Sequence, residues 1–243
     1  MIRRYRDALI MDGGDEVFVV TCDSLGSIGR KPLDALKVDE EIVGRYTLRV
    51  ALAEALCLGA WPLVVCDTLC NEMFPTGRKI IEGIKKELEE SGFYNIPLTG
   101  STEENFETMM TGIGITVISK AKKTSLKVDK VRSGMSIALV GYPRVGQEVM
   151  DCSDVLSLRD YIALGRSKEV KEVVPVGSRG IAYEVSVIEG ISSCKFLGHF
   201  PSYIDAAKSG GPSTCAIVVY ERQDDEKVRS LCDKPFTPLG IVR

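Results

Sequence analysis

Residues 44–60, GRYTLRVALAEALCLGA, decide the fold class of the chain. Apolar residues recur through this stretch at helical spacing, and Gly59 is typical of the residue that ends a helix. The run PLVVC at 62–66 follows directly and reads as a buried strand. A helix that leads at once into a strand predicts a mixed α/β (α+β) fold.

The same mixture of helices and strands extends along the chain. A polar, lysine-rich stretch at 120–134 separates two such mixtures and is typical of a domain boundary. We therefore expect two α/β domains, residues 1–125 and 126–243. The further expected strands are EVFVVTCDS (16–24), IPLTG (96–100), GIGITVISKA (112–121), MSIALVG (135–141) and TCAIVVYE (214–221), and the further expected helices are 75–92, 155–165 and 180–190.

Composition restricts the class of partner. The chain has 243 residues, 44% of them hydrophobic, and a net charge of -3, so it offers no cationic field for a nucleic-acid backbone. The apolar run near its start, residues 8–11, is too short for a signal-peptide core, and no apolar segment is long enough to span a bilayer. We expect a cytoplasmic protein without nucleic-acid or membrane partners.

Cysteine and histidine usage limits the possible chemistry. The eight cysteines lack the paired spacing of a structural zinc site and read as buried, reduced thiols, although CDTLC at 66–70 leaves a metal site open. His199 is the only histidine, which excludes zinc catalysis by two or three imidazoles. Chemistry must therefore come from carboxylates, hydroxyls, Lys, Arg and backbone dipoles.

The stretch LTGSTEENF at 98–106 combines small residues with adjacent carboxylates. Backbone N–H groups at Gly100, Ser101 and Thr102 would suit an anion, and Glu103 beside that anion would require a cation between them. The stretch thus indicates phosphate with Mg²⁺. The alternative is a turn followed by a helix start, with Ser101 or Thr102 as the cap.

Three further acids are candidate metal ligands. Asp23 ends a strand and precedes the small residues and cations of DSLGSIGRK, where Lys31 would contact phosphate, although a β-turn explains this segment too. Glu54 has apolar neighbours and needs a partner or a cation, unless it lies on the one wet stripe of its helix. Asp7 is a candidate ligand, with a helix cap or a surface position as the alternative.

The turn GYPRVGQE at 141–148 places Gly141 and Gly146 at the spacing of a nucleotide P-loop. Gln147 stands where the phosphate-binding Lys belongs and Glu148 where the Mg²⁺-binding hydroxyl belongs, which excludes an ordinary P-loop. Anion contact through backbone N–H groups and a bare strand-to-helix turn both remain open.

Asp7, Asp23, the ALAEALCLGAWPL helix and PLTGSTE occur in the order of four motifs known from one protein superfamily. Together they resemble the superfamily of aminoimidazole ribonucleotide synthetase (PurM-like), which includes thiamine monophosphate kinase, selenophosphate synthetase and a hydrogenase maturation factor. GYPRVG and SGGPSTCAIVVYE (209–221) extend the resemblance over nearly the whole chain.

The resemblance implies ATP-dependent phosphoryl chemistry with Mg²⁺, on a two-domain fold that dimerises through its N-terminal β-sheet domain. It implies Asp7, Asp23, Glu54 and Glu103 as metal ligands, with Asp23 and Glu103 as catalytic residues. The sequence also departs from the family pattern. Thr102 replaces an Asp, so Glu103 or Glu104 would have to serve the metal. Residues 51–53 replace the family's Asn-Leu-Ser, which removes polar contacts, and the C-terminal half is short.

CDSLGSIGRK, CNEMFPTG and LTGSTEENF are most similar to the α-ribazole kinase branch. That resemblance implies transfer of the ATP γ-phosphate to the 5′-hydroxyl of a nucleoside, α-ribazole. Asn71 and Glu72, in CNEM after a strand, are candidates for contact with the acceptor, with helix capping as the alternative. Another ATP-dependent enzyme that activates an amide or carbonyl oxygen as a phosphate ester, a non-catalytic nucleotide sensor and an interaction scaffold are the other possibilities.

Overall fold

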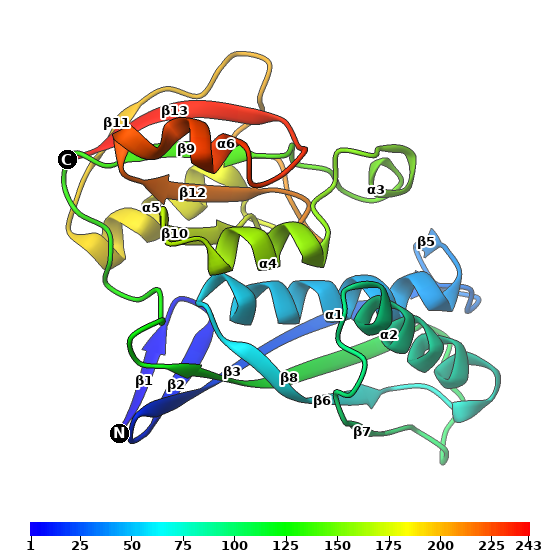
Figure 1. Cartoon of the computed structure of the whole chain (residues 1–243). Coiled ribbons are helices and arrows are strands. Elements are labelled where there is room, and N and C mark those ends of the chain that lie inside the picture. Colours follow the sequence, from blue (N-terminus) through cyan, green and yellow to red (C-terminus); the bar gives the residue numbers. More distant parts are fainter. The chain divides into compact units, whose positions relative to one another are not determined.

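The computed structural model describes residues 1–243, which form two compact units (Figure 1). The first unit comprises Met1–Ala55 and Trp61–Ala121, and the second comprises Leu56–Ala60 and Lys122–Arg243. The passage from one unit to the other at residue 122 lies close to the boundary expected after residue 125. No helix combines the length and the apolar character that crossing a membrane requires.

A six-stranded sheet forms the first unit, in the order β1-β2-β3-β8-β6-β7. Strands β6 and β7 run parallel because helix α2 connects them, whereas β1–β2, β2–β3 and β6–β8 are antiparallel. The strands are β1 (Ile2–Tyr5), β2 (Ala8–Gly13), β3 (Glu16–Gly26), β6 (Trp61–Leu69), β7 (Leu98–Ser101) and β8 (Gly112–Lys122), and a separate short pair is β4 (Ile28–Gly29) with β5 (Leu36–Lys37).

Helices α1 (Glu40–Cys57) and α2 (Arg78–Glu90) cover one face of this sheet (Figure 1), and the short η1 (Met73–Gly77) precedes α2. Alternate residues of β3, such as Val17 and Val19, are buried beneath the helices, as the period of two of a strand requires. The Thr21 hydroxyl on the same face donates to the Ala51 carbonyl of α1 at 2.6 Å. The helix–strand order predicted from residues 44–66 is confirmed.

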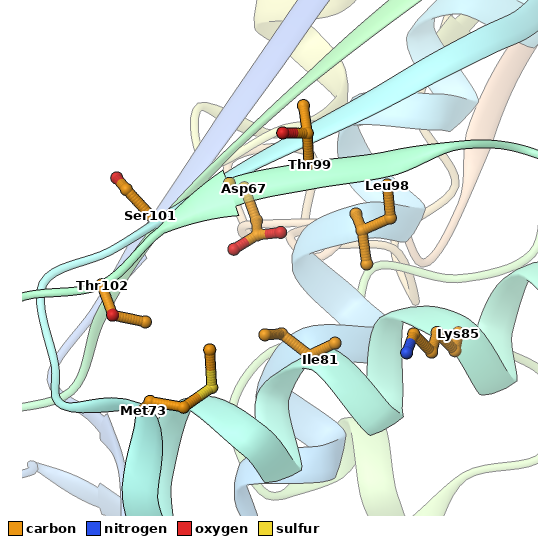
Figure 2. A pocket seen from close by; sticks show the side chains of 9 residues that line it. Asp67, Met73, Ile81, Lys85, Leu98, Thr99, Ser101 and Thr102 are labelled. Atoms are coloured by element: carbon orange, nitrogen blue, oxygen red, sulfur yellow. The ribbon is translucent and has the colours of Figure 1, made fainter.

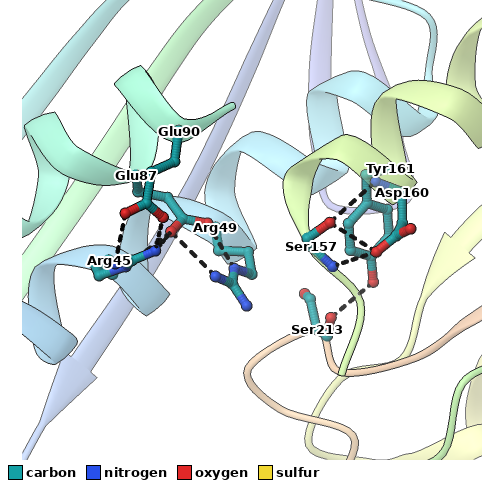
Figure 3. A network of polar contacts seen from close by, with 8 residues as sticks. All are labelled: Arg45, Arg49, Glu87, Glu90, Ser157, Asp160, Tyr161 and Ser213. Atoms are coloured by element: carbon teal, nitrogen blue, oxygen red, sulfur yellow. Dashed lines mark hydrogen bonds and ion pairs between the residues drawn. The ribbon is translucent and has the colours of Figure 1, made fainter. Parts of the chain in front are cut away.

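A buried ion cluster joins α1 to α2 (Figure 3). The Glu87 carboxylate, only 2% exposed, accepts hydrogen bonds from Arg49 Nε at 2.8 Å and from Arg45 Nε at 3.1 Å. The helices can approach this closely because glycines lie at the contact. A Cβ on Gly83 would come within 2.0 Å of the Glu41 carbonyl oxygen.

The second unit contains an antiparallel five-stranded sheet in the order β10-β12-β9-β13-β11. The Tyr161 hydroxyl, fully buried on α4, donates to the Ser213 carbonyl at 2.9 Å, and Ser157 and Asp160 form a capping box at the start of the same helix (Figure 3). The elements are β9 (Ser136–Val140), α3 (Glu148–Asp151), α4 (Leu158–Arg166), β10 (Val170–Pro175), α5 (Gly180–Ser192), β11 (Phe196–Gly198), β12 (Ala216–Tyr220), η2 (Arg222–Asp224), α6 (Asp225–Arg229) and β13 (Phe236–Val242).

One buried hydroxyl in the first unit makes no hydrogen bond. Ser119 on β8 is 0% exposed, and its Oγ has no partner. We expect Ser119→Ala to raise the free energy of unfolding by about 1 kcal/mol, because it removes an unsatisfied buried polar group. Urea unfolding measures the change, and Thr21→Val, which removes a hydroxyl that is hydrogen-bonded, is the matched control and should destabilise. A lower stability for Ser119→Ala would contradict this expectation.

Candidate active site

Two carboxylates lie on the helix-covered face of the first sheet, Asp23 on β3 and Asp67 on β6. Along β3, Val17, Val19 and Thr21 are buried beneath the helices, and Asp23 continues the same alternation. On β6, Asp67 lies between the buried Val65 and Leu69. The intervening strand is β8, so the sheet presents both acids toward the same side.

Asp23 is partly buried, and burial raises its pKa from 3.8 to about 6, while the Ser24 backbone N–H partly offsets this shift. No positively charged side chain contributes to the pKa of Asp23. An ionised carboxylate in this position is therefore incompletely compensated. A divalent cation would supply the missing positive charge.

Asp67 is buried more completely, at 3% exposure, and burial raises its pKa as well. The parallel register places Asp67 opposite Gly100 of β7, and a Cβ on Gly100 would lie 2.4 Å from Asp67 Oδ1. Only glycine leaves room for the carboxylate there. Sequence reasoning missed Asp67, although a single acid within the apolar run VVCDTL was a usable signal.

Beside Asp67 is a pocket of about 270 Å³ between β7 and α2 (Figure 2). Gly100, Ser101 and Thr102 line this pocket together with Asp67. These are the three residues predicted from the sequence to bind phosphate. The remaining lining residues are Met73, Ile81, Lys85, Leu98 and Thr99.

The loop that follows β7 is held by its own carboxylates. Glu103 Oε1 accepts from the Asn105 N–H at 2.6 Å, and Glu104 Oε1 accepts from the Thr102 hydroxyl at 2.7 Å and from the Met73 N–H at 2.8 Å. The hydrogen bonds from Thr102 and Met73 lower the pKa of Glu104. Residues 102–111 form no helix, so the alternative of a helix start at Ser101 or Thr102 is wrong.

Lys31, Glu72 and Asn71 make structural contacts in this chain. Lys31 Nζ lies 2.7 Å from Glu72 Oε2. Burial opposes ionisation of Glu72, but hydrogen bonds from Lys31 and Thr76 outweigh it and lower the pKa of Glu72. The Glu72 side chain caps no helix.

Asn71 is fully buried. Its Nδ2 donates to the Thr108 hydroxyl at 2.7 Å and to the Met110 carbonyl at 2.9 Å, while its Oδ1 accepts from the Gly112 N–H at 2.9 Å. These contacts fasten the loop before β8 to the end of β6. Both the Nδ2 and the Oδ1 of Asn71, which the sequence indicated as a candidate contact for the phosphoryl acceptor, are therefore engaged within the protein.

The acids expected at the metal site do not form one cluster. Asp7 lies at the exposed turn between β1 and β2, which is a hairpin rather than a helix start, 4.0 Å from Arg4. Glu54 pairs with the nearly buried Arg6 at 3.6 Å, so a cation of the chain compensates it. No group of three or more His, Cys, Asp or Glu residues is placed to hold a metal ion. The expected set of Asp7, Asp23, Glu54 and Glu103 is therefore not assembled within this chain.

In the second unit, the turn with Gly141 and Gly146 is filled by the protein's own groups. The Val145 N–H donates to Glu148 Oε2 at 3.2 Å, and Lys208 Nζ lies 2.7 Å from the same oxygen. A carboxylate thus already occupies a donor that a phosphate would use. The helix that follows, α3, has only four residues.

The cysteines differ partly from expectation. All eight are free thiols, and Cys57, Cys194 and Cys215 are buried, but Cys22 and Cys70 are exposed. The CDTLC segment forms no metal-holding group, so the open alternative of a metal site there is not supported.

Comparison with solved structures finds the same architecture over both units. AaThiL, a thiamine monophosphate kinase solved with AMPPCP and TMP, is 15% identical, with a TM-score of 0.69, over 98% of this chain and 84% of its own. HypE from a HypE–HypF complex is 19% identical, with a TM-score of 0.69, over 98% of this chain and 87% of its own.

Thermotoga maritima PurL, solved with ATP, is 14% identical with a TM-score of 0.69, and the match spans 100% of this chain but 43% of PurL. A scan against protein-family models found no match, and a search of curated protein sequences found none. The chain therefore has the PurM-like fold, which it shares with thiamine monophosphate kinase, HypE and PurL.

Proposed function

We propose that this protein is an ATP- and Mg²⁺-dependent phosphotransferase that transfers the γ-phosphate of ATP to a hydroxyl of a small molecule. The observation that carries the proposal is the structural match, over 98% of the chain, to a kinase solved with AMPPCP and TMP. The two helix-side acids and the small residues of β7 are compatible with this chemistry, because phosphoryl transfer depends mainly on positioning and charge neutralisation.

Asp23 is the residue of this chain that best fits a magnesium ligand. Mg²⁺ usually keeps several waters and is held by one or two carboxylates together with substrate phosphates, so it does not require a cluster of protein acids. The bound ion would neutralise charge on the transferred phosphoryl group. The backbone N–H groups of Gly100, Ser101 and Thr102 are the proposed phosphate donors, and Glu103 remains a candidate catalytic group.

The acceptor implied by the sequence resemblance is the 5′-hydroxyl of α-ribazole, and we propose it as the first substrate to test. Mg·ATP consumption should be measured with a panel of nucleosides that includes α-ribazole, and phosphorus NMR should identify the product. A stable phosphomonoester supports the kinase. Turnover of ATP only with an amide acceptor and a nitrogen nucleophile supports the alternative, ATP-dependent activation of a carbonyl oxygen.

That alternative is kept because proteins other than kinases match equally well. HypE and PurL, the latter a phosphoribosylformylglycinamidine synthase, match this structure with the same TM-score as AaThiL. A non-catalytic nucleotide sensor would bind ATP without turnover for any acceptor, and calorimetry beside the turnover assay identifies that case. An absence of ATP binding would contradict all of these nucleotide functions.

We also propose that the protein is a homodimer formed through the first sheet. No helix of the first unit covers the second face of this sheet (Figure 1), which carries the exposed Ile2, Leu9 and Phe18 at 66, 45 and 38% exposure. The strand register places Met11 opposite Phe18, so these side chains share one face. A second copy would remove this apolar area from water.

We expect light scattering to give about twice the chain mass of 26.6 kDa for the wild type and the single-chain mass for Phe18→Asp. Burying the introduced carboxylate between two copies would be unfavourable. Tyr94→Asp is the matched control because Tyr94 is exposed outside the sheet, and it should leave the mass unchanged. A monomeric wild-type protein would contradict the proposal.

A further inference from the structure

The pocket between β7 and α2 contains a carboxylate whose charge no other side chain compensates. Asp67 makes no ion pair, and its own backbone amide is the one group that partly offsets the effect of burial on its pKa. Burying a carboxylate without donors is unfavourable, so a group retained in this state is a candidate for contact with a ligand. The carboxylate lies against Gly100, a residue that lines the pocket.

The lining restricts the chemistry of that ligand. Asp67 repels phosphate and accepts hydrogen bonds, so the part of the ligand next to it must be an uncharged or cationic donor. Met73, Ile81 and Leu98 offer apolar contacts on the other sides of the pocket (Figure 2). A compact group with hydroxyls on one edge and C–H bonds on its faces fits both surfaces.

The volume of the pocket further restricts the size of the ligand. The pocket measures about 270 Å³, just below the roughly 300–1,000 Å³ typical of sites for drug-sized molecules. It therefore suits one ring of a nucleoside rather than a whole nucleotide. An acidic residue that accepts from ribose hydroxyls is an established way of recognising nucleosides.

We propose that this pocket binds the ribose of a nucleoside, with its 2′- and 3′-hydroxyls donating hydrogen bonds to the Asp67 carboxylate. The inference deepens the proposed function, on which it rests for the presence of a nucleoside substrate. The ribose can belong to ATP or to a nucleoside acceptor, since both carry the same diol. Phosphates or a 5′-hydroxyl would then lie farther from the carboxylate, toward the backbone of Ser101 and Thr102 at the end of β7.

Calorimetry without Mg²⁺ compares two ligand pairs on wild type and Asp67→Asn: ATP with 2′-deoxy-ATP, and α-ribazole with its 2′-deoxy analogue. In at least one pair the wild type should prefer the ribose form about tenfold, as expected for a hydrogen bond to a charged group. Asp67→Asn should reduce that preference to about twofold or less and should raise the melting temperature, because a buried charge is removed. The pair that responds identifies which substrate supplies the ribose.

Asp15→Asn makes the same chemical change at an exposed acid and should leave the preference intact. An equal preference in wild type and Asp67→Asn, no preference in either pair, or no binding of either pair would overturn the inference. Because binding is read without turnover, a protein that discriminates the diol but transfers no phosphate would disprove the kinase proposal alone.

Discussion

Asp23→Asn is expected to lower phosphoryl transfer by about a hundredfold or more while making the protein more stable. Catalysis falls because the amide carries no charge to hold a cation at the phosphates, where electrostatic stabilisation dominates. Stability rises because burial raises the pKa of Asp23 from 3.8 to about 6, which corresponds to about 3 kcal/mol against the ionised form. Initial rates with Mg·ATP and denaturant unfolding at pH 7 measure the two effects.

The raised pKa of Asp23 also determines how stability and catalysis should depend on pH. The folded state binds the Asp23 proton more tightly than the unfolded state, so this group lowers stability as pH rises from about 4 to 6, and the loss is complete above 6. The ratio kcat/KM for ATP, which reports ionisation in the free enzyme, should show the opposite trend and decline below pH 6, where the Asp23 carboxyl of the metal-free protein becomes protonated. Asp23→Asn should remove its part of both dependences. Unchanged turnover in this variant would exclude Asp23 from the site.

Glu87→Ala is expected to reduce the free energy of unfolding by about 3–5 kcal/mol, the usual result of leaving a buried charge without its partner. Arg49 is 8% exposed, and its guanidinium would lose the Glu87 carboxylate that now lies 2.8 Å away. Urea unfolding monitored by circular dichroism measures the loss. Glu90→Ala is the matched control, because the Glu90 side chain is 49% exposed and its ion pair with Arg45 should contribute less than about 1 kcal/mol.

The double variant Arg49→Met with Glu87→Leu separates two explanations of that loss. If the loss of Glu87 as the carboxylate partner of Arg49 causes it, replacing Arg49 and Glu87 together by apolar side chains should recover most of the stability, since Arg45 keeps its ion pair with Glu90. If the double variant is as unstable as Glu87→Ala, the packing of the glutamate between α1 and α2 is responsible instead.

The helices and strands could be predicted from the sequence more completely than the residues of the candidate site. Apolar periodicity is local, so it locates the helix that ends at Cys57 before Gly59 and the strand after it. In the hairpin of β1 and β2, the apolar Ile2 and Leu9 are exposed as well as the basic Arg3 and Arg4. The strands therefore lack the alternation of apolar and polar residues that would have revealed the hairpin, and with it the place of Asp7 at its turn.

The site depends on which distant side chains meet, and spacing cannot determine that. Glu54 needs a cation, as the sequence indicated, but Arg6 provides it. Asn71 resembles an exposed acceptor ligand in sequence, yet three hydrogen bonds bury it. Asp67 becomes visible as a pocket residue only when β6 pairs with β7 and brings Gly100 against it.

The last two residues of α1 and the turn after it, Leu56–Ala60, belong to the second unit although they interrupt the first. Within that second unit the Leu58 carbonyl accepts from the Lys127 N–H at 3.0 Å, and a Cβ on Gly165 would lie 2.1 Å from the Leu56 carbonyl oxygen. A gene fragment beginning at residue 122 would encode a unit that lacks part of its own core. The two units therefore cannot be exchanged between homologous proteins by a single crossover near residue 122. Such a chimera would be expected to fold only if residues 56–60 match the second unit with which they pack.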